Sequence, residues 1–130
     1  MLGWLLLVIS PLIPLAKKLV QYGIIPFLLC LVYGWLAVNN LGGAEGGFGS
    51  LAEVKKLFSS DLVLLAGWIH YLAFDLWVGS WELNDSKKYG IHHLVMIPIF
   101  LATFMLGPLG LAIYFVVRAI YTKSILNENF

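Results

Sequence analysis

The chain has few charged residues: lysine, arginine, aspartate and glutamate together make up 12% of its 130 residues. Soluble domains carry about 25% charged residues, so this composition leaves too little polar side chain to cover a water-exposed surface. Hydrophobic residues make up 61% of the chain and aromatic residues 15%. A lipid bilayer is the solvent that suits such a surface, so the composition predicts an integral membrane protein.

The chain also has few cysteines and histidines, and its net charge is small. The single cysteine, Cys30, excludes an intrachain disulfide and any multi-cysteine metal site, and we expect it to be a small packing residue. Three histidines are too few for the histidine boxes of membrane di-iron desaturases. No candidate zinc ligands lie at the helical i, i+4 spacing, so no metal site is predicted. The net charge of +1 gives no reason to expect a nucleic-acid partner.

The start of the chain has no basic stretch before its first apolar residues, as a secretory signal would have. Residues 1–10 are apolar at once, and no Ser- and Arg-rich transit peptide precedes them. Such a start fits a bacterial protein of the inner membrane, an organelle-encoded protein, or a fragment whose leader has been removed. The sequence leaves all three open.

Four apolar runs predict an all-α, polytopic membrane protein. A membrane-spanning helix needs about 20 predominantly apolar residues. The first run contains Pro11 and Pro14, so we expect this span to be kinked or shortened at its start. Five glycines in residues 42–50 predict a flexible loop. The chain is therefore predicted to be a single transmembrane domain, 1–130, with four transmembrane helices. These helices are predicted at about 2–16, 24–41, 62–81 and 92–119.

Two ionisable residues lie inside the third predicted helix. Such residues are costly in a membrane, so His70 and Asp75 are candidates for a functional site. Five residues separate them, which places their side chains about 140° apart around the helix axis. Burial disfavours the charged form of a carboxyl group, so Asp75 is a candidate general acid. The alternative is that Asp75 bonds a neighbouring side chain and only fixes the packing of helices.

Two further histidines are predicted to lie near Asp75. The connection that follows the third helix is short, so the third and fourth helices should be antiparallel neighbours. His92 and His93 would then begin the fourth helix close to Asp75 and Glu82, forming a polar cluster near one membrane face. One of these histidines is a candidate base. An ordinary helix start at the membrane interface is the alternative for both.

Four residues are candidates for holding a pigment. His70 is either a packed, hydrogen-bonded histidine or a ligand to the magnesium of chlorophyll. Trp77 suits an aromatic belt and would pack against a pigment. Pro108 predicts a kink in the fourth helix, where Gly107 and Gly110 allow another helix or a flat polyene to approach closely. The ligand expected from these residues is thus a long apolar molecule such as a polyene, or a chlorophyll, if the chain holds one.

Two long motifs carry a resemblance to a known family. They are WIHYLAFDLWVG at 68–79 and TFMLGPLGLAIY at 103–114, with FGSL at 48–51 and GIHHL at 90–94 in supporting positions. In this order they resemble the family named after the plant protein abscisic acid deficient four. The resemblance covers most of the chain, and best the stretch from Phe48 to Arg118.

The resemblance implies a four-helix protein of plastid membranes, thylakoids included, or of bacterial membranes. It associates the chain with neoxanthin synthesis, in which an epoxide of violaxanthin is isomerised to an allenic alcohol. That reaction needs an acid at the epoxide oxygen and a base at the neighbouring vinylic carbon. We expect Asp75 to be the acid, with His70, His92 or His93 as the base.

Two other functions stay open at this point. One is a non-catalytic, pigment-binding subunit of a photosynthetic membrane complex, such as a photosystem, in which His70 would coordinate the magnesium of chlorophyll. The other is a membrane scaffold without a pigment. The lipid bilayer is the expected partner in every case, and a carotenoid is the expected partner in the first.

Overall fold

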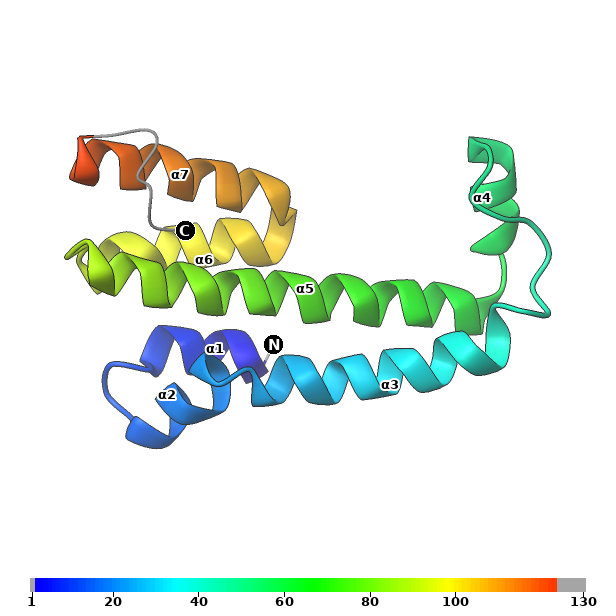
Figure 1. The fold of residues 1–130 in the computed structure, drawn as a ribbon, viewed down its shortest axis with the longest axis horizontal. Helices are drawn as coiled ribbons and strands as arrows, with labels where there is room; N and C mark the ends of the chain where they lie inside the picture. The colour runs from blue at the N-terminus through cyan, green and yellow to red at the C-terminus, as the bar shows by residue number, and fades with distance from the viewer. Residues whose placement is uncertain (1, 124–130) are drawn as a thin grey trace. The chain divides into compact units, whose positions relative to one another are not determined.

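The computed structural model describes residues 2–123, apart from the side chains at positions 17 and 21. In this part of the chain all regular secondary structure is helix, and turns and loops join the helices. The all-α prediction is therefore confirmed for the described residues. The helices are α1 (Leu2–Ile9), α2 (Pro14–Gln21), α3 (Ile24–Asn40), α4 (Leu51–Leu57), α5 (Asp61–Lys88), α6 (His93–Leu106) and α7 (Pro108–Thr122) (Figure 1). Two segments are long and apolar enough to cross a membrane, Pro14–Asn40 and Asp61–Lys88. Four such segments were predicted.

The chain divides into two compact units. The first unit takes in the described residues up to Ile25 and those from Asp75 onward, and the second unit is Pro26–Phe74. Helix α5 contributes its first half to the second unit and its second half to the first. Each unit is described below by itself.

The first predicted helix, 2–16, is two helices in the structure. Helix α1 ends at Ile9, and α2 begins at Pro14 after a turn. Ile13 precedes a proline and is extended, with φ −125° and ψ 110°, because the proline ring disfavours the helical conformation of the residue before it. Pro14 then occupies the first turn of α2, where its missing N–H breaks no helical hydrogen bond.

The last predicted helix, 92–119, is also two helices. The chain reverses at Gly107, whose φ of 40° lies in a region that glycine adopts at little cost. Pro108 then starts α7, which packs along α6 as a helical hairpin (Figure 1). The sequence predicted a kink at this point. With 14 and 15 residues, the two helices are each about 22 Å long, less than the roughly 30 Å of a hydrocarbon core.

Gly110 sets how closely the two helices of this hairpin approach. A Cβ atom at position 110 would overlap the backbone and the hydroxyl group of Thr103. Gly110→Ala should therefore push α7 away from α6 and lower the free energy of unfolding by about 1–3 kcal/mol, as overpacked cores do. Thermal unfolding of the purified protein in detergent measures this change.

Gly34→Ala in α3 is the matched control, because a Cβ atom at position 34 would meet no other atom within 4 Å. Alanine favours the helix more than glycine does, so this variant should be slightly more stable than the wild type. Equal stability of the two variants would show that the close contact at Gly110 does not hold the hairpin together.

Helix α1 packs against α5 and α6 in the first unit through small residues. Gly3 contacts Leu76, and Gly79 lies against the side chains of Trp4 and Leu7. The indole ring of Trp4 also lies 5.4 Å from the ring of Phe104 in α6, measured between centroids. Small residues let helix backbones approach closely where lipid supplies little driving force for association.

In the second unit, the glycine-rich loop before α4 is held to that helix by Glu53. The carboxylate of Glu53 accepts a hydrogen bond from the backbone N–H of Gly49 at 3.2 Å, and its own N–H donates to Ser50 Oγ at 3.3 Å. This exchange resembles a capping box. Gly46, with φ 97°, lets the loop pass close to the backbone of α4. The loop predicted to be flexible is thus tied to α4 by specific hydrogen bonds.

Candidate functional site

Polar side chains are buried in the first unit, where the second half of α5 meets the α6–α7 hairpin. Glu82 and Asp85 come from α5, Thr103 from α6, and Arg118 from α7, and all four are almost inaccessible to solvent. Burying polar groups is costly unless they bond one another. The bonding partners of each buried group therefore indicate whether that group has a structural or a functional role.

Asp85 and Arg118 form a buried ion pair between α5 and α7. The carboxylate oxygen Oδ2 of Asp85 lies 2.8 Å from Arg118 Nε and accepts a hydrogen bond of 2.7 Å from the hydroxyl of Tyr114. Arg118 Nη2 also donates to the hydroxyl of Tyr89 at 2.9 Å, and the guanidinium lies over the Tyr89 ring. Each buried charge in this network thus has a partner of opposite charge, so its role is to hold α7 against α5.

Glu82 has a different environment. Its side chain is fully buried, and both carboxylate oxygens lie 3.1 Å from Thr103 Oγ1, which donates its single proton to them. Among the side chains that the structure describes, which leave out that of Lys17, no lysine or arginine forms an ion pair with Glu82. A buried carboxyl group with only a hydroxyl partner is expensive to maintain, which makes Glu82 a candidate functional residue.

Asp75 lies two turns before Glu82 on the same face of α5, because seven residues turn the helix by nearly two full rotations. Its side chain is half-buried. A Cβ atom at position 107 would lie 2.9 and 3.0 Å from the two carboxylate oxygens of Asp75. The missing side chain of Gly107 therefore makes room for Asp75 at the point where the hairpin reverses.

The structure does not bring His92 and His93 to Asp75. His92 caps the start of α6, where its Nδ1 accepts a hydrogen bond from the N–H of Leu94, and His93 Nε2 lies 2.8 Å from the carbonyl oxygen of Val8. Helix α5 continues to Lys88, so Asp75 lies about 20 Å before its end. The start of α6 follows that end, and the predicted cluster of Asp75 with two histidines is therefore wrong.

His70 belongs to the second unit, where it is exposed and surrounded by aromatic rings. Its imidazole stacks on Phe74 with centroids 4.7 Å apart and meets the ring of Tyr33 edge-on at 5.2 Å. In the part of the chain that the structure describes, no three histidine, cysteine, aspartate or glutamate side chains gather as a metal site.

Within the first unit, Trp77 does not share a surface with Gly107 and Gly110. Trp77 lines a cavity of about 190 Å³, together with Val20, Tyr22, Gly23, Ser80, Trp81 and Asn84. Trp77 and Asp75 are two residues apart on α5, so their side chains point in nearly opposite directions. The space beside Gly107 is filled by Asp75, and the space beside Gly110 by Thr103. Both glycines thus serve the packing of the hairpin in this structure.

Sequence reasoning placed Glu82 only in a predicted cluster and missed the ion pair of Asp85 with Arg118. A signal for the pair was available, since Asp85 and Tyr89 are four residues apart, as are Tyr114 and Arg118. Such spacing puts each pair of polar side chains on one helix face, where the two faces can meet.

Comparisons with known proteins were made for the whole chain. The model of the family described as ABA DEFICIENT 4-like matches residues 1–114. The chain is also 24% identical, over 133 residues, to Protein ABA DEFICIENT 4, chloroplastic, from Arabidopsis thaliana. That alignment covers 96% of this chain and 57% of the plant protein, so the chain spans little more than half of its relative's length. No solved structure matches the chain.

Proposed function

The chain belongs to the ABA DEFICIENT 4-like family, and from this premise we propose that it is an integral membrane protein that isomerises an epoxide end group of a xanthophyll to an allenic alcohol. The observation that carries the proposal is the placement of two carboxyl groups, Asp75 and Glu82, on one face of α5 against the α6–α7 hairpin. Violaxanthin is the proposed substrate and neoxanthin the proposed product.

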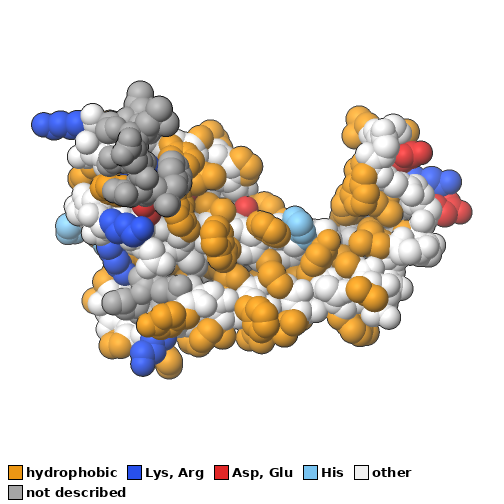
Figure 2. Space-filling model, in the orientation of Figure 1, with side chains coloured by type: hydrophobic (Ala, Val, Ile, Leu, Met, Phe, Trp, Pro, Cys, Tyr) orange, Lys and Arg blue, Asp and Glu red, His pale blue; other side chains and the backbone are white. Residues whose placement is uncertain are grey.

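A location in the membrane is supported by the apolar surface of the helices. Large hydrophobic side chains are exposed along both units, and Figure 2 shows them over much of the visible face. On α3, for example, Trp35 is 68% exposed and Val38 is 84% exposed. Water would not favour so much exposed apolar surface, whereas acyl chains would cover it. We propose a plastid membrane, or the inner membrane of a bacterium, as the location.

The proposed reaction moves protons and needs no oxidant. An acid donates a proton to the epoxide oxygen while the bond from that oxygen to the ring carbon beside the polyene breaks. A base removes the hydrogen from the neighbouring vinylic carbon, and its electron pair forms the new double bond of the allene. The product has the same atoms as the substrate, with one epoxide converted to a hydroxyl group.

Asp75 is the proposed acid, because it is half-buried and so can be reached from outside the packed hairpin. Glu82 is the proposed base in place of a histidine, and because its side chain is fully buried, the α6–α7 hairpin must move away from α5 for the substrate to reach it. It lies two turns from Asp75 on the same helix face, and Thr103 fixes the direction of its carboxylate. His92 and His93 are at the other end of α6, about 15 Å from Thr103 along the helix.

A second candidate function is pigment binding without chemistry. The cavity beside Trp77 favours it, because two indole rings and the Tyr22 ring line it together with the polar groups of Ser80 and Asn84. Such a lining suits the ring of a pigment that carries an oxygen substituent. In this alternative the chain would be a subunit of a photosynthetic membrane complex, with His70 as a candidate ligand to chlorophyll.

One experiment separates the two candidates. The protein is purified in mild detergent, its bound pigments are extracted and identified by chromatography, and the protein is then incubated with violaxanthin. Formation of neoxanthin above the no-protein rate supports the isomerase. Stoichiometric pigment without turnover supports the binding subunit. A colourless protein that converts no violaxanthin contradicts both.

A further inference from the structure

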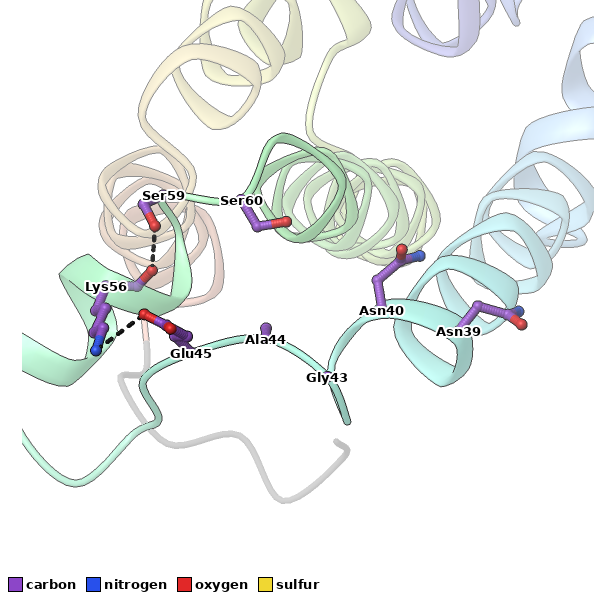
Figure 3. Close-up of a pocket in the computed structure, with 8 residues that line it drawn as sticks. All are labelled: Asn39, Asn40, Gly43, Ala44, Glu45, Lys56, Ser59 and Ser60. Carbon is purple, nitrogen blue, oxygen red and sulfur yellow. Dashed lines mark hydrogen bonds and ion pairs between the residues drawn. The ribbon is translucent and has the colours of Figure 1, made fainter.

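A polar cavity of about 450 Å³ lies in the second unit, away from the residues of the proposed reaction. Figure 3 shows its border, which consists of the end of α3, the loop after it, α4 and the residues just before α5. Its volume is in the range of sites that bind small molecules. The lining residues are Asn39, Asn40, Gly43, Ala44, Glu45, Lys56, Ser59 and Ser60.

The charges at this cavity cancel. Lys56 Nζ lies 3.0 Å from Glu45 Oε2, and both side chains are well exposed. A bound phosphate or sulfate would need a cationic group whose charge is not already balanced, as the strong sites for these anions have. The ion pair of Lys56 with Glu45 thus disfavours an anionic ligand and leaves a lining that is neutral as a whole.

The same lining is rich in hydrogen-bonding groups. Asn40 uses one N–H to bond the carbonyl of Leu36 at 2.7 Å, which leaves its amide oxygen and its second N–H for a ligand. Ser59 donates its proton to the carbonyl of Lys56 at 2.6 Å and keeps its acceptor lone pairs. Ser60 adds a hydroxyl group that can both donate and accept. Closely spaced donors and acceptors without net charge complement a group that carries several hydroxyls.

The position of the cavity indicates where such a group would come from. It opens where α3 ends and α5 begins, and both helices belong to segments that are long enough to cross a membrane. Trp35, Val38 and Leu62, close to this end, are exposed apolar side chains. Tryptophan is enriched at the level of lipid headgroups. A polar cavity beside an apolar flank fits a lipid whose headgroup enters the cavity while its chains follow the helices.

We infer that this cavity binds the sugar headgroup of a neutral glycolipid. The inference rests on the membrane location in the proposed function and is independent of the isomerase reaction. The hydroxyls of the sugar bond the amide of Asn40 and the hydroxyls of Ser59 and Ser60. The acyl chains lie against the exposed side chains of α3 and α5.

The test reconstitutes the full chain in nanodiscs of phosphatidylcholine that contain equal small fractions of monogalactosyl diacylglycerol and phosphatidylglycerol. Lipid retained after transfer to detergent is measured by mass spectrometry. The wild type should retain the galactolipid, whereas Asn40→Ala should lower its retention about fivefold, because a ligand hydrogen bond is lost. Ser60→Ala provides a second variant if Asn40→Ala does not fold. Lys88→Ala, at the exposed end of α5 in the other unit, is the control that should retain the galactolipid as the wild type does.

Several outcomes would overturn the inference. The first is stronger retention of phosphatidylglycerol than of the galactolipid. The second is equal retention of the galactolipid by the wild type and the folded cavity variants. The third is binding of soluble methyl galactoside that is as tight as binding of the galactolipid. Flotation of the protein with vesicles is measured first. If the protein does not float, the proposed membrane location is wrong. If the protein floats but does not retain galactolipid, only the assignment of the cavity is contradicted.

Discussion

Asp75→Asn is expected to lower the rate of violaxanthin isomerisation by about 100-fold or more, since a positioned general acid contributes roughly 10²–10⁴-fold to a rate. Asparagine has nearly the shape of aspartate, so it should keep the contact with Gly107 but cannot donate an acidic proton. The rate is measured as neoxanthin formed in the first minutes of reaction, with violaxanthin above and below its half-saturating concentration. A loss in kcat at unchanged KM is the signature expected of an acid in the chemical step.

Two sets of variants make this result interpretable. Asp61→Asn, at the exposed start of α5, is the matched control and should leave the rate unchanged. Glu82→Gln should lower the rate as Asp75→Asn does, whereas His92→Gln and His93→Gln should retain it. Full activity of Asp75→Asn would refute the assignment of the acid. Full activity of Glu82→Gln with loss in a histidine variant would return the role of the base to histidine.

Arg118→Ala is expected to lower the free energy of unfolding by about 3–5 kcal/mol, because it leaves the carboxylate of Asp85 buried without its cation. The change also removes the hydrogen bond to Tyr89 and the stacking on its ring. Helix α7 should then separate from α5 well before the rest of the chain unfolds. Thermal unfolding in detergent, followed by circular dichroism, measures the loss.

The matched control for Arg118→Ala is Lys56→Ala, which removes one partner of an exposed ion pair. Exposed pairs contribute at most about 1 kcal/mol, so this variant should unfold almost as the wild type does. The double variant Asp85→Leu with Arg118→Met should recover most of the stability, because apolar side chains can replace a buried ion pair at little cost. A double variant as unstable as Arg118→Ala would mean that shape, rather than the uncompensated charge, causes the loss.

The positions of apolar runs in the sequence predicted most of the helices, but not where the chain turns. Helix α3 starts at the predicted residue and ends one residue before the predicted 41. The stretch 92–119 was interpreted as one helix because hydropathy does not distinguish a straight helix from two helices folded onto each other. The reversal depends on the positive φ of Gly107 and on the close contact at Gly110. Neither the backbone angle at Gly107 nor the contact at Gly110 can be predicted from the apolarity of residues.

The candidate site was predicted in part for a related reason. Asp75 was singled out because a carboxyl group inside an apolar run is conspicuous. The polar residues after Trp81 were interpreted as a connection, whereas α5 continues through them to Lys88. The hairpin buries Glu82 and Asp85 and supplies their partners. Partners that are 21 to 33 residues away in sequence cannot be recognised without the fold, and this is why the histidines seemed closer to Asp75 than they are.

The reversal at Gly107 also bears on how the chain is oriented in a bilayer. Because α6 and α7 form a hairpin, Arg118 and Lys123 emerge at the end of α5 that carries Lys87 and Lys88. Lys55 and Lys56, in the last turn of α4, lie just before the opposite end of α5. A straight fourth span would instead have left only Lys87 and Lys88 at this end and placed Arg118 and Lys123 at the opposite end with Lys55 and Lys56. Of these six cations the hairpin gathers four at one end and leaves two at the other, so for the membrane location proposed above the positive-inside rule assigns the end of α5 at Lys88 to the cytoplasmic or stromal side.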